Sequence, residues 1–312
     1  MKETQQMTSK TVLVTGALGL IGNAVRHLLE ERGDMVIAID RVAGRVDGYN
    51  VRECDVTDIH GLYSLARAHP FTHIVHCGAF SGPMVAADHP IQMVQVNIGG
   101  VANIAELARN LGGARVVFAS TATAYGATPP GPVPEDTILR PDSVYGASKA
   151  SAEHLLDAYR LQFGLDTVSL RIGWVYGPRC RTACVIRAML EEALASRLCA
   201  LPFGREFPRQ FVHIDDVARA MVLALDTPGL PRQNYNITGG SQHTIGEVAE
   251  LVMQVVPGAR ITVAPGDDPG DMRQDLFDIS AAERDLDYIP QIPLADGIRS
   301  YFDWLKAERG AT

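Results

Sequence analysis

The sequence predicts an α/β protein with a doubly wound parallel sheet and a smaller C-terminal lobe. Short β-branched runs alternate with longer helix-period segments from Thr11 to Ile172. Strand and helix in series produce a parallel sheet with helices on both faces. A glycine-rich turn directly follows the first run, and after Ile172 proline and glycine become frequent while the alternation ends.

The elements of the sheet domain follow from these two periodicities. Strands are expected at the β-branched runs Thr11–Thr15, Met35–Asp40, Val51–Cys54, Thr72–Cys77, Arg115–Ala119 and Thr167–Ile172. Helices are expected where apolar residues recur at spacings of three and four. These segments are Leu20–Glu31, Ile59–Ala68, Ile91–Asn110 and Val144–Phe163.

The C-terminal lobe is expected to close over the strand ends, where open α/β sheets bind their ligands. Its predicted elements are helices near Thr182–Ser196, Asp215–Asp226, Thr244–Val255 and Ala295–Lys306, and a strand at Arg209–His213. One or two of these segments should cross back to the sheet. The expected division is residues 8–173 with about 209–237 for the sheet domain, and about 174–208 with 238–312 for the lobe.

Composition narrows the class of protein. Hydrophobic residues make up 46% of the chain and charged residues 21%, a balance typical of globular proteins. The formal net charge is -8 and the basic residues are scattered singly, which argues against a nucleic-acid partner. No apolar run reaches the roughly 18 residues of a membrane span, and the polar N-terminal stretch lacks a signal-peptide core. We therefore expect no membrane partner and a cytoplasmic location.

The cysteines predict reduced thiols and no metal site. No two of them form a Cys-x-x-Cys pair, and no histidine pair lies near them. Two have the spacing of neighbours on a helix, Cys180 and Cys184. The remaining three are Cys54, Cys77 and Cys199.

The turn after the first strand has the spacing of a dinucleotide-binding loop, Gly16-Ala17-Leu18-Gly19-Leu20-Ile21-Gly22. Glycine at these positions permits a tight turn, a close approach of a pyrophosphate, and close packing of helix on strand. The next strand ends at Asp40, where a carboxylate can accept hydrogen bonds from both adenosine ribose hydroxyls and repel a 2′-phosphate. NAD is therefore favoured over NADP, although Arg41 or Arg45 could turn toward a phosphate. The structural alternative is a plain loop capped by Asp40.

A tyrosine and a lysine stand four residues apart, at Tyr145 and Lys149, and so share one helix face. A free phenol has a pKa near 10 and is a poor base at neutral pH. An ammonium about 4 Å away would supply most of the required lowering, roughly 4 kcal/mol. The pair therefore predicts proton transfer by Tyr145, with Lys149 also binding the nicotinamide ribose. The alternative is an amphipathic helix with a packed tyrosine and a solvated lysine.

Hydroxyl side chains follow the strand that begins at Arg115. The run Ser120-Thr121-Ala122-Thr123 lies at its carboxyl end. A hydroxyl there can donate to a substrate oxygen while Tyr145 takes or gives its proton. Thr121 is the candidate for this role.

At this point the sequence resembles the extended short-chain dehydrogenases/reductases, the NAD-dependent epimerase/dehydratase family that includes UDP-galactose 4-epimerase. The resemblance covers nearly the whole chain. The motifs that carry it are Gly16-x-x-Gly19-x-x-Gly22, Asp55-Val56, His76-Cys77-Gly78-Ala79, Asn97, Ser120-Thr121-Ala122-Thr123-Ala124-Tyr125-Gly126, Tyr145-x-x-x-Lys149, Leu170-Arg171, Val175-Tyr176-Gly177-Pro178 and Arg209-Gln210-Phe211-Val212-His213-Ile214-Asp215-Asp216-Val217.

The resemblance implies a Rossmann domain, an NAD cofactor and a set of site residues. The catalytic set is Thr121, Tyr145 and Lys149. Expected cofactor contacts are Gly16, Gly19, Leu20, Ile21, Gly22, Asp40, Asp55, Val56, Ala79, Asn97, Tyr145, Lys149 and Ile172. Expected substrate contacts are Ser81, Thr121, Thr123 and Arg209.

Departures from the family pattern bear on the chemistry. Dehydratases and decarboxylases of this family follow the threonine with an acid, whereas Ala122 and Thr123 follow Thr121 here. Members that act on nucleotide sugars usually hold the diphosphate with two arginines, one at the position of Arg209 and one just before a Pro-Gly-Asp turn. In this chain Asp268, itself preceded by an aspartate, stands before that turn. A carboxylate repels a diphosphate, although Arg205 or Arg273 could still bind phosphate.

These observations predict an NAD-dependent oxidoreductase that transfers hydride at a secondary alcohol or ketone carbon of a sugar, sugar acid, lactone or similar small polar substrate. The alternative is an NAD-dependent sugar-nucleotide epimerase, because the hydroxyl strand resembles that of the 4-epimerases. A third reading is a redox-sensing or binding protein without turnover, but such proteins usually lack the tyrosine or the lysine. Hydride transfer that is abolished by Tyr145→Phe would exclude it.

A homodimer is also expected. The helices predicted at Ile91–Asn110 and Val144–Phe163 carry apolar residues on more than one face, which indicates either deep burial or a partner. The family resemblance implies a four-helix bundle that these helices form across a two-fold axis. Burial within one monomer is the alternative, and sedimentation would decide between them.

Overall fold

The fold is organised around one eight-stranded sheet. The structure is a computed structural model that describes residues 9–85, 88–182 and 184–310. The strand order is β12-β7-β6-β5-β1-β2-β4-β3, and every neighbouring pair is parallel except β3 with β4. The strands are β1 (Thr11–Thr15), β2 (Met35–Asp40), β3 (Gly44–Val46), β4 (Tyr49–Glu53), β5 (His73–His76), β6 (Arg115–Thr121), β7 (Thr167–Ile172) and β12 (Asn234–Ile237). The predicted doubly wound parallel sheet is confirmed.

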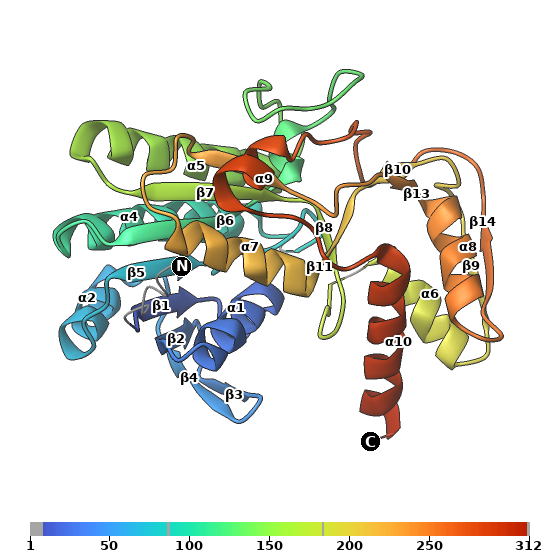
Figure 1. Cartoon of the computed structure of the whole chain (residues 1–312), viewed down its shortest axis with the longest axis horizontal. Coiled ribbons are helices and arrows are strands. Elements are labelled where there is room, and N and C mark those ends of the chain that lie inside the picture. Colours follow the sequence, from blue (N-terminus) through green and yellow to red (C-terminus); the bar gives the residue numbers. More distant parts are fainter. Residues whose placement is uncertain (1–8, 86–87, 183, 311–312) are drawn as a thin grey trace, which may run out of the picture.

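Helices cover both faces of the sheet (Figure 1). One face packs against α1 (Leu20–Glu31) and α7 (Ile214–Asp226), and the other against α2 (Ile59–Ala68), α4 (Gly100–Asn110) and α5 (Val144–Phe163). Strand β1 shows why both faces are apolar, because successive side chains point to opposite sides. Val12 and Val14 join the core under α1 and α7, while Leu13 joins the core under α2 and α4.

A second cluster of helices lies beside the strand ends, at the right of Figure 1. It consists of α6 (Val185–Leu194), α8 (Ile245–Val255), α10 (Leu294–Gly310) and the parallel pair β9 (Leu198–Leu201) with β14 (Arg260–Val263). These elements share a hydrophobic core of their own. The predicted return to the sheet is made by α7 and β12, and by α9 (Ser280–Leu286), which packs on them.

The predicted helix over residues 91–110 is interrupted. It consists of α3 (Pro90–Val94), a π-helical turn (Gln95–Gly99) and α4. A π-turn inserts one extra residue and so rotates the side chains that follow relative to a regular helix. Asn97 lies within it and is buried.

The predicted strand over residues 209–213 divides at Gln210. β10 (Pro208–Arg209) pairs antiparallel with β13 (His243–Thr244), whereas β11 (Phe211–His213) pairs parallel with β8 (Trp174–Tyr176). The buried Gln210 amide lies at the change of partner: it donates to the Asp275 carbonyl at 2.8 Å and accepts from the Phe277 N–H at 2.8 Å.

Smaller differences concern the ends of elements. Helix α6 begins only at Val185, so Cys180 and Cys184 do not lie together on it as their spacing indicated. Cys184 is the residue that precedes the helix. None of the described helices combines the length and the apolarity that crossing a membrane requires.

Candidate active site

The turn between β1 and α1 depends on its glycines. Gly16 has a φ of +66°, and a Cβ there would stand 2.8 Å from the Cys77 carbonyl carbon. A Cβ on Gly22 would stand 2.2 Å from the Gly16 carbonyl oxygen. A side chain at Gly16 would push the turn away from the end of β5, and one at Gly22 would push α1 away from the turn. The glycines therefore allow the helix to begin directly at the strand end.

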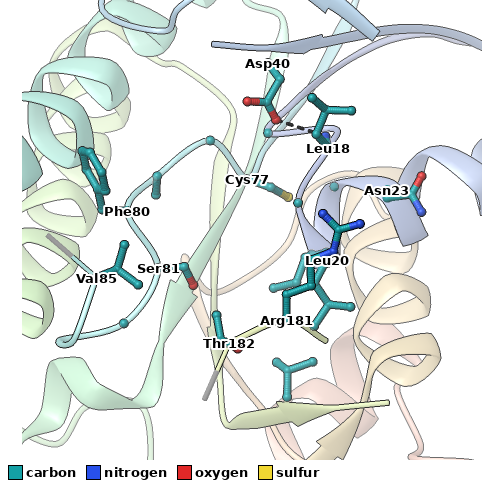
Figure 2. Close-up of a pocket in the computed structure, with 18 of the residues that line it drawn as sticks. Leu18, Leu20, Asn23, Asp40, Cys77, Phe80, Ser81, Val85, Arg181 and Thr182 are labelled. Carbon is teal, nitrogen blue, oxygen red and sulfur yellow. Dashed lines mark hydrogen bonds between the residues drawn. The ribbon is translucent and has the colours of Figure 1, made fainter. Parts of the chain in front are cut away.

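The start of α1 is open to an anion. Its N-cap is Gly19, which has no side chain to accept from the first-turn N–H groups, and that turn contains no acidic residue. Uncapped N–H groups and the helix dipole together favour negative charge. Beside them the Leu18 N–H donates to the Asp40 carboxylate at 3.0 Å, as Figure 2 shows. The bare glycine surface, the open helix end and the carboxylate fit a dinucleotide with its pyrophosphate on the helix.

A cavity of about 1480 Å³ runs along this turn and past the ends of β6 and β7. It is lined by nearly all of the residues that the sequence proposed for cofactor or substrate. They are Gly16, Gly19, Leu20, Ile21, Gly22, Asp40, Asp55, Val56, Ala79, Ser81, Thr121, Thr123, Tyr145, Ile172 and Arg209. Two proposed residues, Asn97 and Lys149, are not among its lining residues.

Asn97 instead joins two segments that line the cavity. Its side-chain oxygen accepts from the Phe80 N–H at 2.8 Å, and its amide nitrogen donates to the Phe80 carbonyl at 3.1 Å. The same nitrogen donates to the Ser148 hydroxyl of α5 at 2.9 Å. Asn97 therefore positions the loop after β5 against the helix that carries Tyr145.

Three hydroxyl groups meet at Tyr145. The tyrosine is buried, with 8% of its surface exposed, and burial raises the pKa of its phenol. Hydrogen bonds with Thr121 and Ser81 act in the opposite direction and lower that pKa. Thr121 ends β6 and Ser81 lies in the loop after β5, so the parallel sheet brings the two hydroxyls to one edge.

Lys149 is held by the strand next to Tyr145, and it does not line the cavity. The ammonium is buried and donates to the Ala119 carbonyl at 2.8 Å, and it lies 4.6 Å from the centroid of the Phe118 ring. Burial lowers the pKa of Lys149 to about 8. The hydrogen bonds that lower the pKa of Tyr145 in this structure come from the two hydroxyls, and an effect of the Lys149 ammonium on the phenol stays a prediction.

His76, which the sequence indicated only as part of a motif, ends β5 and hydrogen-bonds with Thr15 at the end of β1. Thr15 accepts from the N–H groups of Cys77 at 3.2 Å and Gly78 at 3.0 Å. Its own proton therefore goes to Nδ1 of His76, 2.7 Å away, which leaves the histidine proton on Nε2. Burial, together with the charge of Lys149, lowers the pKa of His76 to about 3.

A buried ion pair, which the sequence did not reveal, packs against the end of β6 and contacts its Ser120 hydroxyl. Glu153 of α5 accepts from Arg171 of β7 at 2.7 Å and also from the Ser120 hydroxyl. Arg171 donates to the Tyr125 hydroxyl at 2.8 Å, and Tyr125 donates to Asn236 of β12 at 2.7 Å. Glu153 stands one helical turn after Lys149, a spacing that could have indicated it.

A second cavity, of about 710 Å³, adjoins the first and extends toward the C-terminal lobe. Thr123, Trp174, Arg181, Thr182, Cys184 and Arg209 line both. In the view of Figure 2, Thr182 is drawn next to Ser81, and Arg181 is drawn nearer to Leu20. Arg209 binds Asp268 and lies 3.2 Å from Asp271.

Comparison with known proteins gives a consistent result. The family model described as the NAD dependent epimerase/dehydratase family matches residues 12–238. A dTDP-4-dehydro-6-deoxy-D-allose reductase of Streptomyces is 30% identical, over 96% of this chain and 97% of that protein. A UDP-glucuronate 4-epimerase of Arabidopsis thaliana is 28% identical, over 94% of this chain and 75% of that protein.

Solved structures are similar as well. The crystal structure of the Thermus thermophilus UDP-glucose 4-epimerase, in complex with NAD, has a TM-score of 0.84 and 32% identity. It covers 97% of this chain, which in turn covers 100% of it.

Proposed function

The chain belongs to the NAD dependent epimerase/dehydratase family, and we propose that its larger cavity transfers hydride at a secondary alcohol or ketone carbon of a sugar, sugar acid or similar small polar substrate. It is an NAD-dependent enzyme, an extended short-chain dehydrogenase/reductase. The observation that carries the proposal is the meeting of Tyr145, Thr121 and Ser81 in the cavity that also contains the glycine turn.

Each proposed role follows from where the residue lies in the cavity. The open end of α1 at Gly19, Leu20 and Ile21 would hold the pyrophosphate, and Asp40 the adenosine ribose. Asp55, Val56, Ala79 and Ile172 would line the remaining cofactor surface. When bound, NAD supplies the acceptor or donor of the hydride.

The chain itself handles the proton. Tyr145 would take the proton from the substrate hydroxyl, or return it to the carbonyl. The single Thr121 proton would be donated to the phenolate before the transfer from substrate and to the substrate oxygen after it. Ser81, Thr123 and Arg209 would contact the substrate. The Lys149 ammonium would bind the nicotinamide ribose after leaving the Ala119 carbonyl.

Hydride transfer is tested by measuring the absorbance of the reduced nicotinamide cofactor while the enzyme is supplied with a panel of sugars, sugar acids, lactones and nucleotide sugars. Tyr145→Phe keeps the ring packed and removes only the hydroxyl, so we expect an activity loss of about 10²–10⁴-fold with unchanged NAD binding. Retention of full activity by Tyr145→Phe would exclude the proposed proton transfer.

A sugar-nucleotide epimerase is the second candidate, favoured by relatives whose names are those of 4-epimerases. The two candidates differ in net redox change. A dehydrogenase converts bulk NAD in proportion to substrate, whereas an epimerase interconverts two sugar isomers with no net change in NAD. Product analysis of the same reactions separates them.

We also propose a homodimer through α4 and α5. The outward face of α5 carries Val144, Ala147, Ser151, His154, Ala158 and Leu161, all exposed and none of them an acid, arginine or lysine.

The division into a cofactor domain, residues 8–173 with about 209–237, and a substrate lobe, about 174–208 with 238–312, is likewise our proposal. It is supported by the separate core of the α6, α8 and α10 cluster. The cytoplasmic location stays a prediction.

A further inference from the structure

The second cavity has too little positive charge for a diphosphate. Among its described lining residues, Arg181, Arg187 and Arg209 stand against four carboxylates, those of Asp142, Glu191, Asp268 and Asp271. Histidine and lysine are absent from that described lining. The diphosphate of a nucleoside diphosphate sugar brings two negative charges, which need cations or N–H donors that are free to face them.

Two of the three arginines are already neutralised. Arg187 donates to Glu191 at 2.8 Å, one turn along α6. Arg209 binds Asp268 and lies 3.2 Å from Asp271, and the side chains of all three residues are less than one-fifth exposed. At such low exposure the attraction within the cluster is weakly screened by solvent. Arg209 therefore adds no net positive charge to the cavity.

The carboxylates of this cluster are held in place by donors of their own. The Trp174 indole N–H donates to Asp271 at 3.1 Å, and the Gly270 N–H donates to Asp268 at 2.9 Å. The Arg209 guanidinium also lies 5.8 Å from the centroids of the Trp174 and Phe207 rings. A phosphate could displace the two carboxylates only by breaking these contacts together.

The same groups are well suited to a sugar without a nucleotide. Carboxylate oxygens accept from hydroxyl groups, and the face of a tryptophan packs against apolar C–H surface. Arg181 has no carboxylate partner in the described part of the chain, and it lies where the two cavities meet. One free guanidinium matches a single carboxylate, the charge of a sugar acid.

We infer that the second cavity receives an uncharged sugar, a lactone or a singly charged sugar acid, and that Asp268 and Asp271 exclude nucleoside diphosphate sugars from it. The inference rests on the proposed hydride transfer at a sugar carbon and specifies the substrate of that same site. It gives Asp268 and Asp271 the role of specificity-determining residues, since their carboxylates pair with Arg209, which would otherwise face a phosphate.

The experiment is a calorimetric titration of UDP into the NAD-loaded enzyme at low salt. We expect no binding up to about 1 mM for the unaltered chain. Asp268→Asn combined with Asp271→Asn keeps shape and hydrogen-bonding oxygens but removes two negative charges, so we expect UDP affinity to rise about tenfold or more. The single variant Asp268→Asn should show a smaller gain in the same direction, and it serves if the double variant does not fold.

Asp267→Asn is the matched control. Asp267 precedes Asp268 directly, but it is 63% exposed, pairs with Arg273 at 2.6 Å and lines neither cavity. Its variant should leave UDP binding unchanged.

Micromolar binding of UDP to the unaltered chain would overturn the inference, as would turnover of UDP-glucose. The inference would also be overturned if folded variants of Asp268 and Asp271 showed no gain in UDP affinity. UDP binding is read as heat and needs no turnover, so its result is separate from the hydride-transfer test of the proposed function.

Discussion

Burial and hydrogen bonding oppose each other at Tyr145. The apolar surroundings raise the pKa of the phenol, and the hydroxyls of Thr121 and Ser81 lower it by stabilising the phenolate. Removal of either hydroxyl should therefore raise the pKa and reduce the fraction of phenolate at neutral pH.

For Thr121→Ala we expect kcat/KM for alcohol oxidation at pH 7 to fall about 10–100-fold, with the rising limb of its pH profile displaced to higher pH. Ser81→Ala should displace the limb in the same direction. Ser64→Ala, at an exposed position of α2 that lines neither cavity, is the control. An unmoved limb in both site variants would contradict the role of the two hydroxyls.

His76 links stability to pH. Its folded pKa of about 3 lies below the unfolded value of 6.5, so the unfolded chain binds a proton that the folded chain does not. The associated stability is fully present above pH 6.5 and is lost as pH falls toward 3.

We expect the free energy of unfolding to drop about 2 kcal/mol more between pH 7 and pH 5 in the unaltered chain than in His76→Asn. Asparagine can still accept from Thr15 in place of Nδ1, so the variant should fold. Urea unfolding at a series of pH values measures the difference, and parallel curves for the two proteins would show that His76 titrates normally.

At the scale of elements, the approach of α1 to the sheet depends on Gly22. Its Cβ position lies 2.2 Å from the Gly16 carbonyl oxygen, and both atoms belong to backbone that cannot move independently. Gly22→Ala should therefore cost about 1–3 kcal/mol of stability. It should also weaken NAD binding, because the open N-terminus of α1 is displaced.

Gly99→Ala is the matched control for the stability part of this prediction only, because Gly99 itself lines the larger cavity. Gly99 has a φ of -62° within helical backbone, and no atom lies within 4 Å of its Cβ position. Alanine there should stabilise by about 0.5–1 kcal/mol through lower backbone entropy of the unfolded chain. Urea unfolding and fluorescence titration with NADH measure both effects, and equal stabilities of the two variants would contradict the proposed packing.

The π-turn at Gln95–Gly99 shows how an element adapts to a site. A regular helix would turn Asn97 to another direction, away from Phe80 and Ser148. The interruption thus allows one amide to hold the loop after β5 against α5. The positions of Ser81 and Tyr145 depend on the same contact.

For the whole molecule, the proposed dimer makes a distinct prediction. Leu161 of α5 is 75% exposed on the face proposed to meet a second copy. A buried carboxylate without a partner strongly opposes association, so Leu161→Glu should convert a dimer to a monomer at micromolar concentration. Sedimentation velocity measures the change.

Ile289→Glu is the control for the dimer. Ile289 is a branched aliphatic residue of similar exposure, 61%, outside α4 and α5. Its variant should sediment like the unaltered chain. A monomeric unaltered chain would contradict the proposal, and so would a dimer that survives Leu161→Glu.

The sequence by itself determined the order of strands and helices, the glycine turn, Asp40 and the helix with Tyr145. These features are local: side-chain periodicity and the conformational freedom of glycine act within a few residues of the chain. The differences were the π-turn within the helix over residues 91–110, the ends of some elements, and the division of a strand at Gln210, whose amide contacts the Asp275 carbonyl 65 positions further along the chain.

Only the tertiary structure decided which groups meet in the site. Ser81 reaches Tyr145, Lys149 turns to a β6 carbonyl, and Arg209 pairs with Asp268, 59 positions away. Such contacts depend on how the sheet and the C-terminal lobe pack, and no local pattern specifies which distant charge a buried arginine will find. The same packing sets the charge of the substrate cavity.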